Sequence, residues 1–212
     1  MSTRLTWLGH GGWAIRSAGQ HVLIDPFLDD SPVAPSRADE VQADFILVTH
    51  GHFDHVADVP KIAIRTGATV VSNYEICEWL SGKGVEKTHG MNIGGGYGFP
   101  FGRVKLTIAH HTSMLPDGAY GGQPSGFLIS FAEGMAYFAC DTGLFYDMKL
   151  IGAKGLTLAS LPIGDKFTMG PDDALEAVKL LAPKRVVPVH NNTWPLIAQD
   201  ARAWAERVRR ET

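Results

Sequence analysis

The 212-residue sequence lacks several features that mark specialised classes of protein. Its two cysteines, Cys77 and Cys140, are too few for a disulfide framework and are typical of a reducing compartment. It has no apolar run near the roughly 20 residues that a membrane span requires. It also has no charged-then-apolar leader, so we expect a cytoplasmic protein rather than an exported one.

The sequence also lacks an excess of positive charge. Lys and Arg together number 19 against 22 Asp and Glu, which gives a formal net charge of -3. A protein that binds nucleic acid usually presents a basic field, so we expect a small-molecule substrate and neither nucleic acid nor membrane as partner. The length and the apolar share of 45% suit one soluble domain, residues 1–212, with its own core.

The order of the predicted elements is rich in strands at first and mixed later. Glycine-punctuated segments predict three opening antiparallel strands over 5–9, 12–18 and 21–27. Further strands are predicted over 44–50, 68–72, 104–111, 125–132, 134–142, 156–164 and 185–190. Helices are predicted over 56–66, 73–84, 170–182 and from 199 onward. The glycine-rich stretch 93–102 is predicted to be an ordered turn.

Four metal-capable side chains follow the strand predicted over 44–50. His50, His52, Asp54 and His55 form the pattern H-x-H-x-D-H. Imidazole and carboxylate together suit borderline metals such as zinc, manganese or iron. Asp54 and His55 point in different directions from His50 and His52, so one ion cannot bind all four. Two neighbouring ions would satisfy this geometry, whereas a solvated polar loop is the alternative for any single histidine.

Three other predicted strands also end on metal-capable residues. His110 and His111 close one of them, Asp141 closes another and His190 closes a third. Each has an ordinary alternative, such as a capping aspartate or a buried histidine with satisfied hydrogen bonds. Taken together they complete a two-metal site in which a carboxylate is available as a bridge.

This set of residues resembles the metallo-β-lactamase superfamily, which implies an α/β (α+β) fold, the four-layer αββα sandwich. The match narrows with the ordered segments "GHGGWAI", "LIDPF", "THGHFDHV", "NIGGGYGFPFG", "CDTGLFYDMKLIG", "LPIGDKFTMGP" and "PVHNNTWP". They resemble the motifs of a bacterial metal-dependent hydrolase branch of undefined substrate. That branch is similar to ascorbate-6-phosphate lactonases and, more distantly, to phospholipase D enzymes that act on N-acyl ethanolamine phospholipids. The resemblance covers roughly residues 5–200.

The resemblance implies a set of ligands for two divalent transition metal ions. It assigns His50, His52 and His111 to one ion, and Asp54, His55 and His190 to the other, with Asp141 as the bridge. Zinc is the first expectation, and manganese, iron or nickel would also suit these ligands. His111 is preferred to His110 because the ligand histidine of the family pattern precedes small hydroxyl residues, here Thr112 and Ser113.

The metal pair predicts hydrolysis. A water that bridges ions about 3.5–4 Å apart loses a proton near neutral pH, and the hydroxide can attack a carbonyl or phosphoryl centre. Asp54 is expected to bind metal and could also move a proton to the leaving group. His10 is expected at the edge of the site, as a donor to the substrate oxyanion or as a partner of a metal ligand. Asp25 could orient a ligand histidine or cap a turn.

The loop 163–171 suggests the charge of the substrate. Lys166 lies before a helix that begins near Pro171, and helix N-termini attract anions. We therefore expect Lys166 and Thr168 to contact an anionic substrate. The alternative for Lys166 is a solvent-facing side chain that covers the loop.

Two departures from the family pattern stand out. Cys140 occupies a position where glycine usually precedes the bridging aspartate, so its thiol is either accommodated or narrows the second site. The family pattern also has a last strand beyond the helix that contains Arg210. Either this edge strand is absent or a partner chain covers the edge, which makes a homo-oligomer possible.

Several functions remain compatible with this pattern. A hydrolase of small lactones, esters or phosphorylated sugar acids is favoured over a phosphodiesterase or nuclease that uses the same metal pair. A di-iron oxidoreductase is a further alternative, but flavodiiron proteins usually carry glutamate where this chain has His52. A regulatory protein that binds metal without turnover has the same ligands. β-Lactam hydrolysis is not expected, because fold does not fix the substrate.

Overall fold

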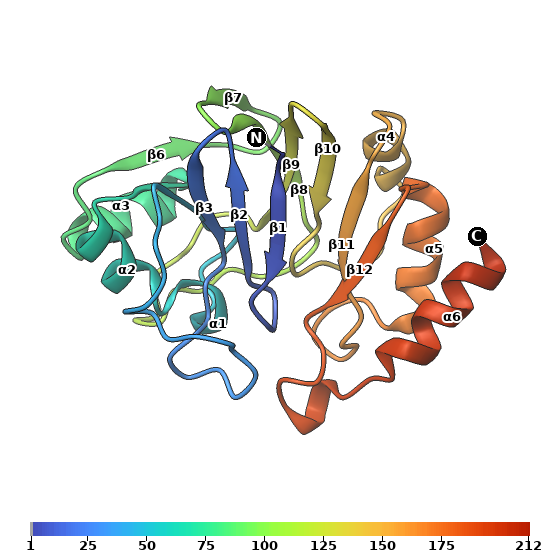
Figure 1. The fold of residues 1–212 in the computed structure, drawn as a ribbon. Helices are drawn as coiled ribbons and strands as arrows, with labels where there is room; N and C mark the ends of the chain where they lie inside the picture. Colours follow the sequence, from blue (N-terminus) through green and yellow to red (C-terminus); the bar gives the residue numbers. More distant parts are fainter. Residues whose placement is uncertain (1) are drawn as a thin grey trace.

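Two six-stranded sheets form the middle of the computed structural model, which describes residues 2–212 (Figure 1). The first sheet contains, in spatial order, β1 (Arg4–Trp7), β2 (Trp13–Ser17), β3 (Gln20–Ile24), β4 (Phe45–Leu47), β5 (Thr69–Asn73) and β6 (Thr88–Met91). The second contains β12 (Val186–Val189), β11 (Leu158–Pro162), β10 (Gly134–Phe138), β9 (Ser125–Phe131), β8 (Gly102–Ile108) and β7 (Gly96–Phe99).

Strand direction in the first sheet follows the length of the connections. β1, β2 and β3 pair antiparallel through short turns, as predicted from the glycine punctuation. β3, β4, β5 and β6 pair parallel, which requires longer crossovers. Those crossovers carry α1 (Phe53–Val56), α2 (Val59–Thr66) and α3 (Tyr74–Gly82). The short β4 is accordingly apolar, with Ile46 and Leu47 fully buried.

The second sheet changes from antiparallel to parallel pairing along its width. β7, β8, β9 and β10 pair antiparallel, whereas β10, β11 and β12 pair parallel. Its remaining elements are α4 (Met148–Gly152), α5 (Pro171–Leu181), the 3-10 helix η1 (Pro195–Ile197) and α6 (Ala201–Glu211). Among residues 2–212, the helices are all too short or too polar to cross a membrane.

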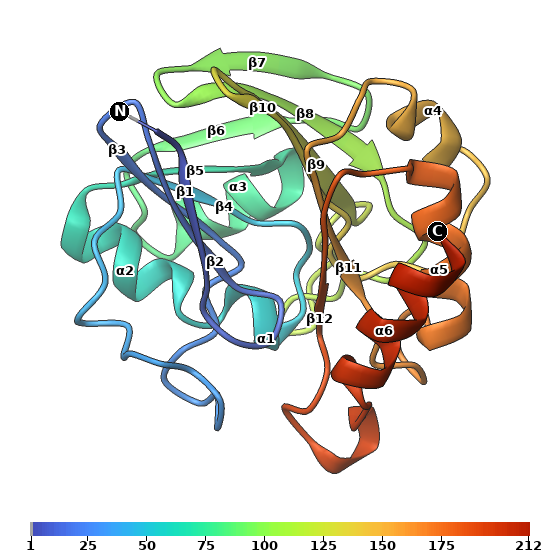
Figure 2. The ribbon, with the colours of Figure 1, turned by 45° about the vertical axis from the view of Figure 1, so that its right-hand side comes forward.

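Three apolar clusters hold four layers together. One includes Ile62 and Leu80, which bury α2 and α3 against the first sheet. Another includes Leu175 and Val178 of α5, which pack on the second sheet together with Trp204 of α6. The third fills the space between the two sheets, where aromatic and branched side chains of both sheets meet. Figure 2 shows the helices on the two outer faces, so the expected four-layer αββα sandwich is confirmed.

Some predicted boundaries were wrong for physical reasons. The stretch 93–102 is not only a turn, because it includes β7 and the hairpin into β8. At that hairpin Gly102 has φ +149°, and a Cβ there would lie 2.5 Å from the carbonyl oxygen of Ser130. The helix predicted over 56–66 is divided, and α2 starts only at Val59. β6 and the five-residue α4 were not predicted, since neither shows a clear apolar period.

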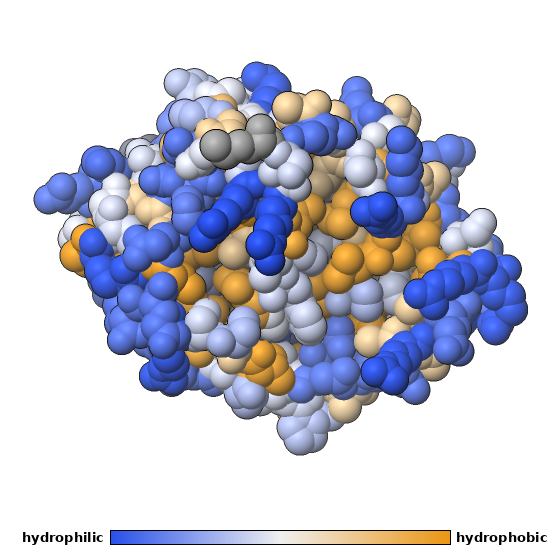
Figure 3. All heavy atoms as spheres, in the orientation of Figure 1, coloured by the Kyte–Doolittle hydropathy of each residue, from blue (hydrophilic) through white to orange (hydrophobic). Residues whose placement is uncertain are grey.

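The end of the second sheet is formed by β12. Within residues 2–212 no strand follows it, and α6 is the last element. A hollow of about 440 Å³ lies between β12 and α6, with Leu158, Val186 and Trp204 among its lining residues. Figure 3 shows apolar side chains at the surface over this end of the sheet.

Candidate metal centre

The predicted metal ligands follow the carboxyl ends of four strands. His50 is the third residue after β4, His111 the third after β8 and Asp141 the third after β10, and His190 directly follows β12. The strands are shorter than predicted, so each of these residues begins or lies in a loop and can turn inward. Strand packing thus brings together side chains that are up to 140 positions apart, from His50 to His190.

His50, His52 and His111 form the first histidine group. Nδ1 of His52 lies 3.0 Å from Nε2 of His50 and 3.2 Å from Nε2 of His111. Around a tetrahedral zinc ion with Zn–N distances near 2.0 Å, two ligand nitrogens are about 3.3 Å apart. The three nitrogens are therefore spaced as ligands of one ion. His110 lies outside this group, with its ring centroid 5.2 Å from that of Phe145.

Asp54, His55, His190 and Asp141 form the second group. Nε2 of His190 lies 2.9 Å from Oδ2 of Asp141 and 3.7 Å from Oδ2 of Asp54. Nε2 of His55 lies 3.5 Å from Oδ2 of Asp141 and 3.7 Å from Oδ2 of Asp54. Oδ2 of Asp141 is also 3.6 Å from Nε2 of His111, in the first group. This carboxylate therefore lies between the two groups.

Several buried polar atoms in this region have no hydrogen-bond partner among residues 2–212. They include Nε2 of His55 and Oδ1 of Asp141. Buried polar side-chain atoms nearly always have a partner, so such a cluster of exceptions calls for a ligand. Lone-pair atoms of imidazole and carboxylate at these separations fit divalent transition metal ions.

The comparisons with known proteins agree with this geometry. Residues 20–191 match the family model of the beta-lactamase superfamily domain. The chain belongs to this superfamily. A protein of Thermus thermophilus named a metal-dependent hydrolase is 48% identical over 203 residues, which cover 96% of this chain and 90% of the relative. Another of that name, from Pelotomaculum thermopropionicum, is 47% identical over 214 residues, with coverage of 99% and 93%.

A solved structure is also similar to this chain. It is a metallo hydrolase from the hyperthermophilic archaeon Ignicoccus hospitalis, with a TM-score of 0.89 and 35% sequence identity. The alignment covers 99% of this chain and 91% of that chain. The resemblance seen in the sequence motifs is thereby confirmed at the level of the superfamily and of its metal-dependent hydrolases.

Asp25 contacts one predicted ligand histidine directly and a second through Thr49. Its Oδ2 accepts a hydrogen bond from Nδ1 of His55 at 2.8 Å, which leaves Nε2 of that ring free to bind metal. Its Oδ1 accepts from the backbone N–H of Thr49 at 2.8 Å, and Oδ2 also accepts from the hydroxyl of Thr49 at 2.5 Å. That hydroxyl lies 3.0 Å from Nδ1 of His50. One fully buried carboxylate thus orients a histidine in each metal group.

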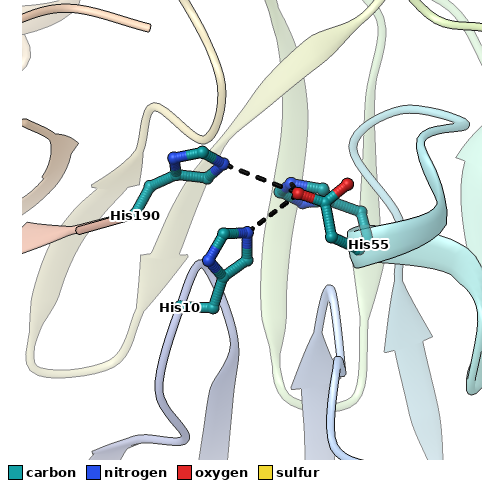
Figure 4. Close-up of side chains that lie close together, drawn as sticks. His10, His55 and His190 are labelled. Carbon is teal, nitrogen blue, oxygen red and sulfur yellow. Dashed lines mark hydrogen bonds and ion pairs between the residues drawn. The ribbon is translucent and has the colours of Figure 1, made fainter. Parts of the chain in front are cut away.

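His10 lies beside the second group and not in the open mouth of the site. Figure 4 shows His10, His55 and His190 turned toward one another from the loop after β1, from α1 and from the end of β12. Nε2 of His10 lies 3.0 Å from Oδ2 of Asp54, and Nδ1 lies 2.7 Å from Oγ1 of Thr193. The ring is fully buried, which favours contact with a ligand over contact with substrate. Thr193 was missed because nothing in the sequence pairs it with a residue 183 positions away.

The burial and the charges of the site set its protonation before metal binding. Burial lowers the pKa of His10 to about 4, so its ring is neutral at pH 7. Nε2 then donates to Asp54 and Nδ1 accepts from Thr193. Burial also disfavours charge on His190, but Asp141 outweighs burial and raises the pKa of His190 to about 9. Burial opposes ionisation of Asp141, yet His190 and His55 hold its pKa well below the usual value.

Lys166 and Thr168 lie in the loop after β11. The backbone N–H of Met169 donates to the carbonyl oxygen of Thr142 at 3.0 Å, which places this loop beside the one that carries Asp141. Nζ of Lys166 lies 5.6 Å from the ring centroid of Phe167, and Oγ1 of Thr168 donates to the carbonyl of Met169 at 3.3 Å. Within residues 2–212, neither side chain bonds to a predicted metal ligand.

Cys140 adopts the backbone conformation that explains why the superfamily pattern has glycine there. Its φ is +54°, in the left-handed region that favours glycine. The thiol is buried, and Sγ lies 3.7 Å from the carbonyl oxygen of Phe138. Burial raises its pKa well above the usual value, so the thiol stays protonated. The core between the sheets therefore accommodates this side chain.

Proposed function

We propose that this metal-dependent hydrolase works with two metal ions. One is held by His50, His52 and His111, the other by Asp54, His55 and His190, with Asp141 as the bridge. The observation that carries this proposal is the convergence of seven side chains from four strand ends, at separations suited to shared metal coordination. Zinc is the first candidate because these imidazole-rich groups suit tetrahedral coordination, and manganese, iron and nickel accept the same ligands.

The reaction we propose is attack by a water-derived hydroxide on a lactone, ester or phosphoester. When bound, such metal ions bring the pKa of a coordinated water toward neutrality and withdraw charge from the substrate oxygen. Asp54 is kept ionised although it is largely buried, because His55, His10 and His190 together lower its pKa. It can take a proton from the attacking water and pass it to the leaving oxygen as the bond to that oxygen breaks.

His10 serves this scheme as a positioning residue. Its Nε2–H holds Oδ2 of Asp54, and the hydroxyl of Thr193 holds the other side of the ring. The carboxylate of Asp54 therefore has little freedom to rotate away from the second metal group. Partners of this kind orient metal ligands and commonly change metal affinity when they are removed.

We propose further that the substrate is small and anionic. Two divalent ions would carry more charge than the carboxylates of Asp25, Asp54 and Asp141 together, so the loaded centre would be positive before the hydroxide forms and would attract an anion. Lys166 and Thr168 would contact the substrate away from the reacting bond, because their loop lies beside the Asp141 loop. Within residues 2–212, Lys166 has no ion-pair partner.

Metal analysis combined with a substrate panel tests this proposal. Wild-type protein purified without chelator should carry nearly two equivalents of transition metal and should hydrolyse at least one class among lactones, β-lactams, phosphodiesters and phosphomonoesters. His111→Ala should lose one equivalent. The matched control His110→Ala removes the neighbouring ring, which is outside both groups, and should keep both metals. Absence of metal after reconstitution with zinc, manganese and iron would refute the proposal.

A further inference from the structure

A hollow of about 480 Å³ lies beside the first histidine group, with His111 among its lining residues. All its lining residues belong to one segment, 111–124, here called the 111–124 loop. Its volume is in the range of small-molecule sites. Thr112 also lines the hollow, and its hydroxyl lies 3.3 Å from Nε2 of His52. A molecule whose reacting bond lies at the metal centre can therefore extend into this hollow.

The 111–124 loop is fixed to the metal-binding segment. Oγ of Ser113 accepts from the backbone N–H of Gly51 at 3.0 Å and donates to the carbonyl of Gly121 at 2.9 Å. Gly51 lies between the ligand histidines 50 and 52. Nδ2 of Asn73 donates to the carbonyls of Gly121 and Gln123 at 2.7 and 3.1 Å. The hollow is thus preformed and held at a set position relative to the metals.

The lining of the hollow is uncharged and mainly apolar, with Met114, Ala119 and Pro124 beside the polar Thr112 and Gln123. Its lining, within the described residues 2–212, contains no Lys, Arg, Asp or Glu. The acid of the loop, Asp117, is instead paired with Nε1 of Trp79 at 2.6 Å and Nζ of Lys83 at 3.2 Å. Met114 and Tyr120 face each other across an isolated β-bridge and are 62% and 70% exposed. Large apolar side chains left exposed beside a reactive centre mark a binding surface.

We propose that the 111–124 loop binds an uncharged apolar part of the substrate, an alkyl chain or an aromatic ring, over Met114 and Tyr120. This inference rests on the proposed function, because the metal centre fixes where the reacting bond lies. It narrows the substrate class to amphipathic esters or phosphoesters, with a polar or anionic head at the metals and an apolar group in the hollow. A phosphorylated sugar would find no charged partner there.

Two ligand series test the proposal on the metal-loaded protein. One is the straight-chain carboxylates from acetate to octanoate, and the other is the alcohols from ethanol to octanol. Binding is followed by NMR shifts of the backbone amides in the 111–124 loop. In both series we expect affinity to rise about threefold for each methylene, somewhat below the roughly fourfold that complete burial gives. Carboxylates should bind more tightly than alcohols of equal length, because their heads reach the metals.

Variants locate the effect in the loop. Tyr120→Ala combined with Met114→Ser should flatten the dependence on chain length and leave the affinity for acetate unchanged. Tyr120→Phe keeps the ring and should retain the dependence. Tyr97→Ala is the matched control, because Tyr97 is also an exposed aromatic residue, at 51%. It lies on β7, where the next residue, Gly98, pairs with Arg103 near the start of β8. The predicted metal ligand His111 follows the opposite end of β8, so Tyr97 is distant from the metal groups.

The outcomes separate this inference from the proposed function. A flat dependence in wild type, or an unchanged dependence in the Tyr120→Ala and Met114→Ser protein, overturns the inference whether or not acetate binds. If the affinity of the alcohols rises with chain length and carboxylates of equal length bind no more tightly, the apolar site is supported. The same result would count against the metal chemistry.

Discussion

Asp25→Asn tests how the metal centre is held together. Both carboxylate oxygens accept hydrogen bonds, Oδ1 from the N–H of Thr49 and Oδ2 from Nδ1 of His55, each at 2.8 Å. An asparagine in the same place presents one oxygen and one NH₂ group. Whichever way the amide turns, its NH₂ group faces an N–H donor, so one buried donor loses its acceptor.

The protonation of His55 decides what this change does to the metal. If the amide nitrogen faces His55, the ring can accept a hydrogen bond only by moving its proton from Nδ1 to Nε2. Nε2 is the atom directed at Asp54 and Asp141, and a protonated ring nitrogen cannot bind metal. Losing such a partner typically lowers metal affinity 10- to 100-fold, or about 1.4–2.8 kcal/mol. If the amide nitrogen faces Thr49, the unpaired N–H costs about 1–3 kcal/mol of stability.

Chelator competition and thermal unfolding measure these effects. We expect the dissociation constant of one metal in Asp25→Asn to rise 10- to 100-fold, together with a lower Tm. Asp58→Asn is the matched control. Asp58 is also buried, but its Oδ2 accepts only from the backbone N–H groups of Leu28 and Asp29, at 2.6 and 3.1 Å. The amide oxygen of an asparagine can keep these bonds. Equal metal affinity in Asp25→Asn and wild type would refute the orienting role of Asp25.

Four further predictions follow from the same geometry. His52→Ala should remove one metal equivalent and lower stability, by about 2.7 kcal/mol if free metal is 100 times its dissociation constant, as thermal unfolding at fixed metal concentration will show. Asp141→Asn should lower metal occupancy and hydrolysis together, and a variant with full occupancy and full rate would make Asp141 a structural cap. Zinc binding at pH 7 should release protons from His190 and His55, because nearby carboxylates raise the pKa of both rings, that of His190 to about 9. Calorimetry in buffers of different ionisation enthalpy should detect this release, and affinity should rise with pH above 7. Lys166→Met should lower activity roughly tenfold on an anionic substrate and leave a neutral analogue unaffected, whereas equal loss on both would remove Lys166 from the site.

The metal groups were accessible from sequence because their signals are local. The pattern from His50 to His55 lies within six residues, and each remaining ligand follows an apolar strand-like run. Strand ends can be read from such runs even when their exact boundaries cannot. The four-layer fold came from the resemblance in motifs and not from periodicity, since residues such as those of β6 carry no clear pattern.

The supporting contacts were not accessible in the same way. The bonds of Asp25 to His55 and of His10 to Thr193 join residues 30 and 183 positions apart. Both depend on how loops from different strands meet, which no local pattern encodes. The 111–124 loop shows the same limit, because its uncharged hollow forms only when the bonds of Ser113 and Asn73 hold the loop beside the metal groups.

The backbone around the metal centre suggests why these contacts are needed. His10, Asp25, Cys140 and His190 all have φ between +43° and +54°, a conformation that costs non-glycine residues roughly 1–2 kcal/mol each. Each lies within three residues of the end of a strand, at a turn that aims the side chain at the centre or positions its neighbour. Such strain persists only where the surroundings over-determine the conformation. The bonds of Asp25 and His10 provide part of that constraint, and metal bound by the native state alone would add to it. Metal occupancy and the stability of these loops should therefore be coupled, because the same residues hold both.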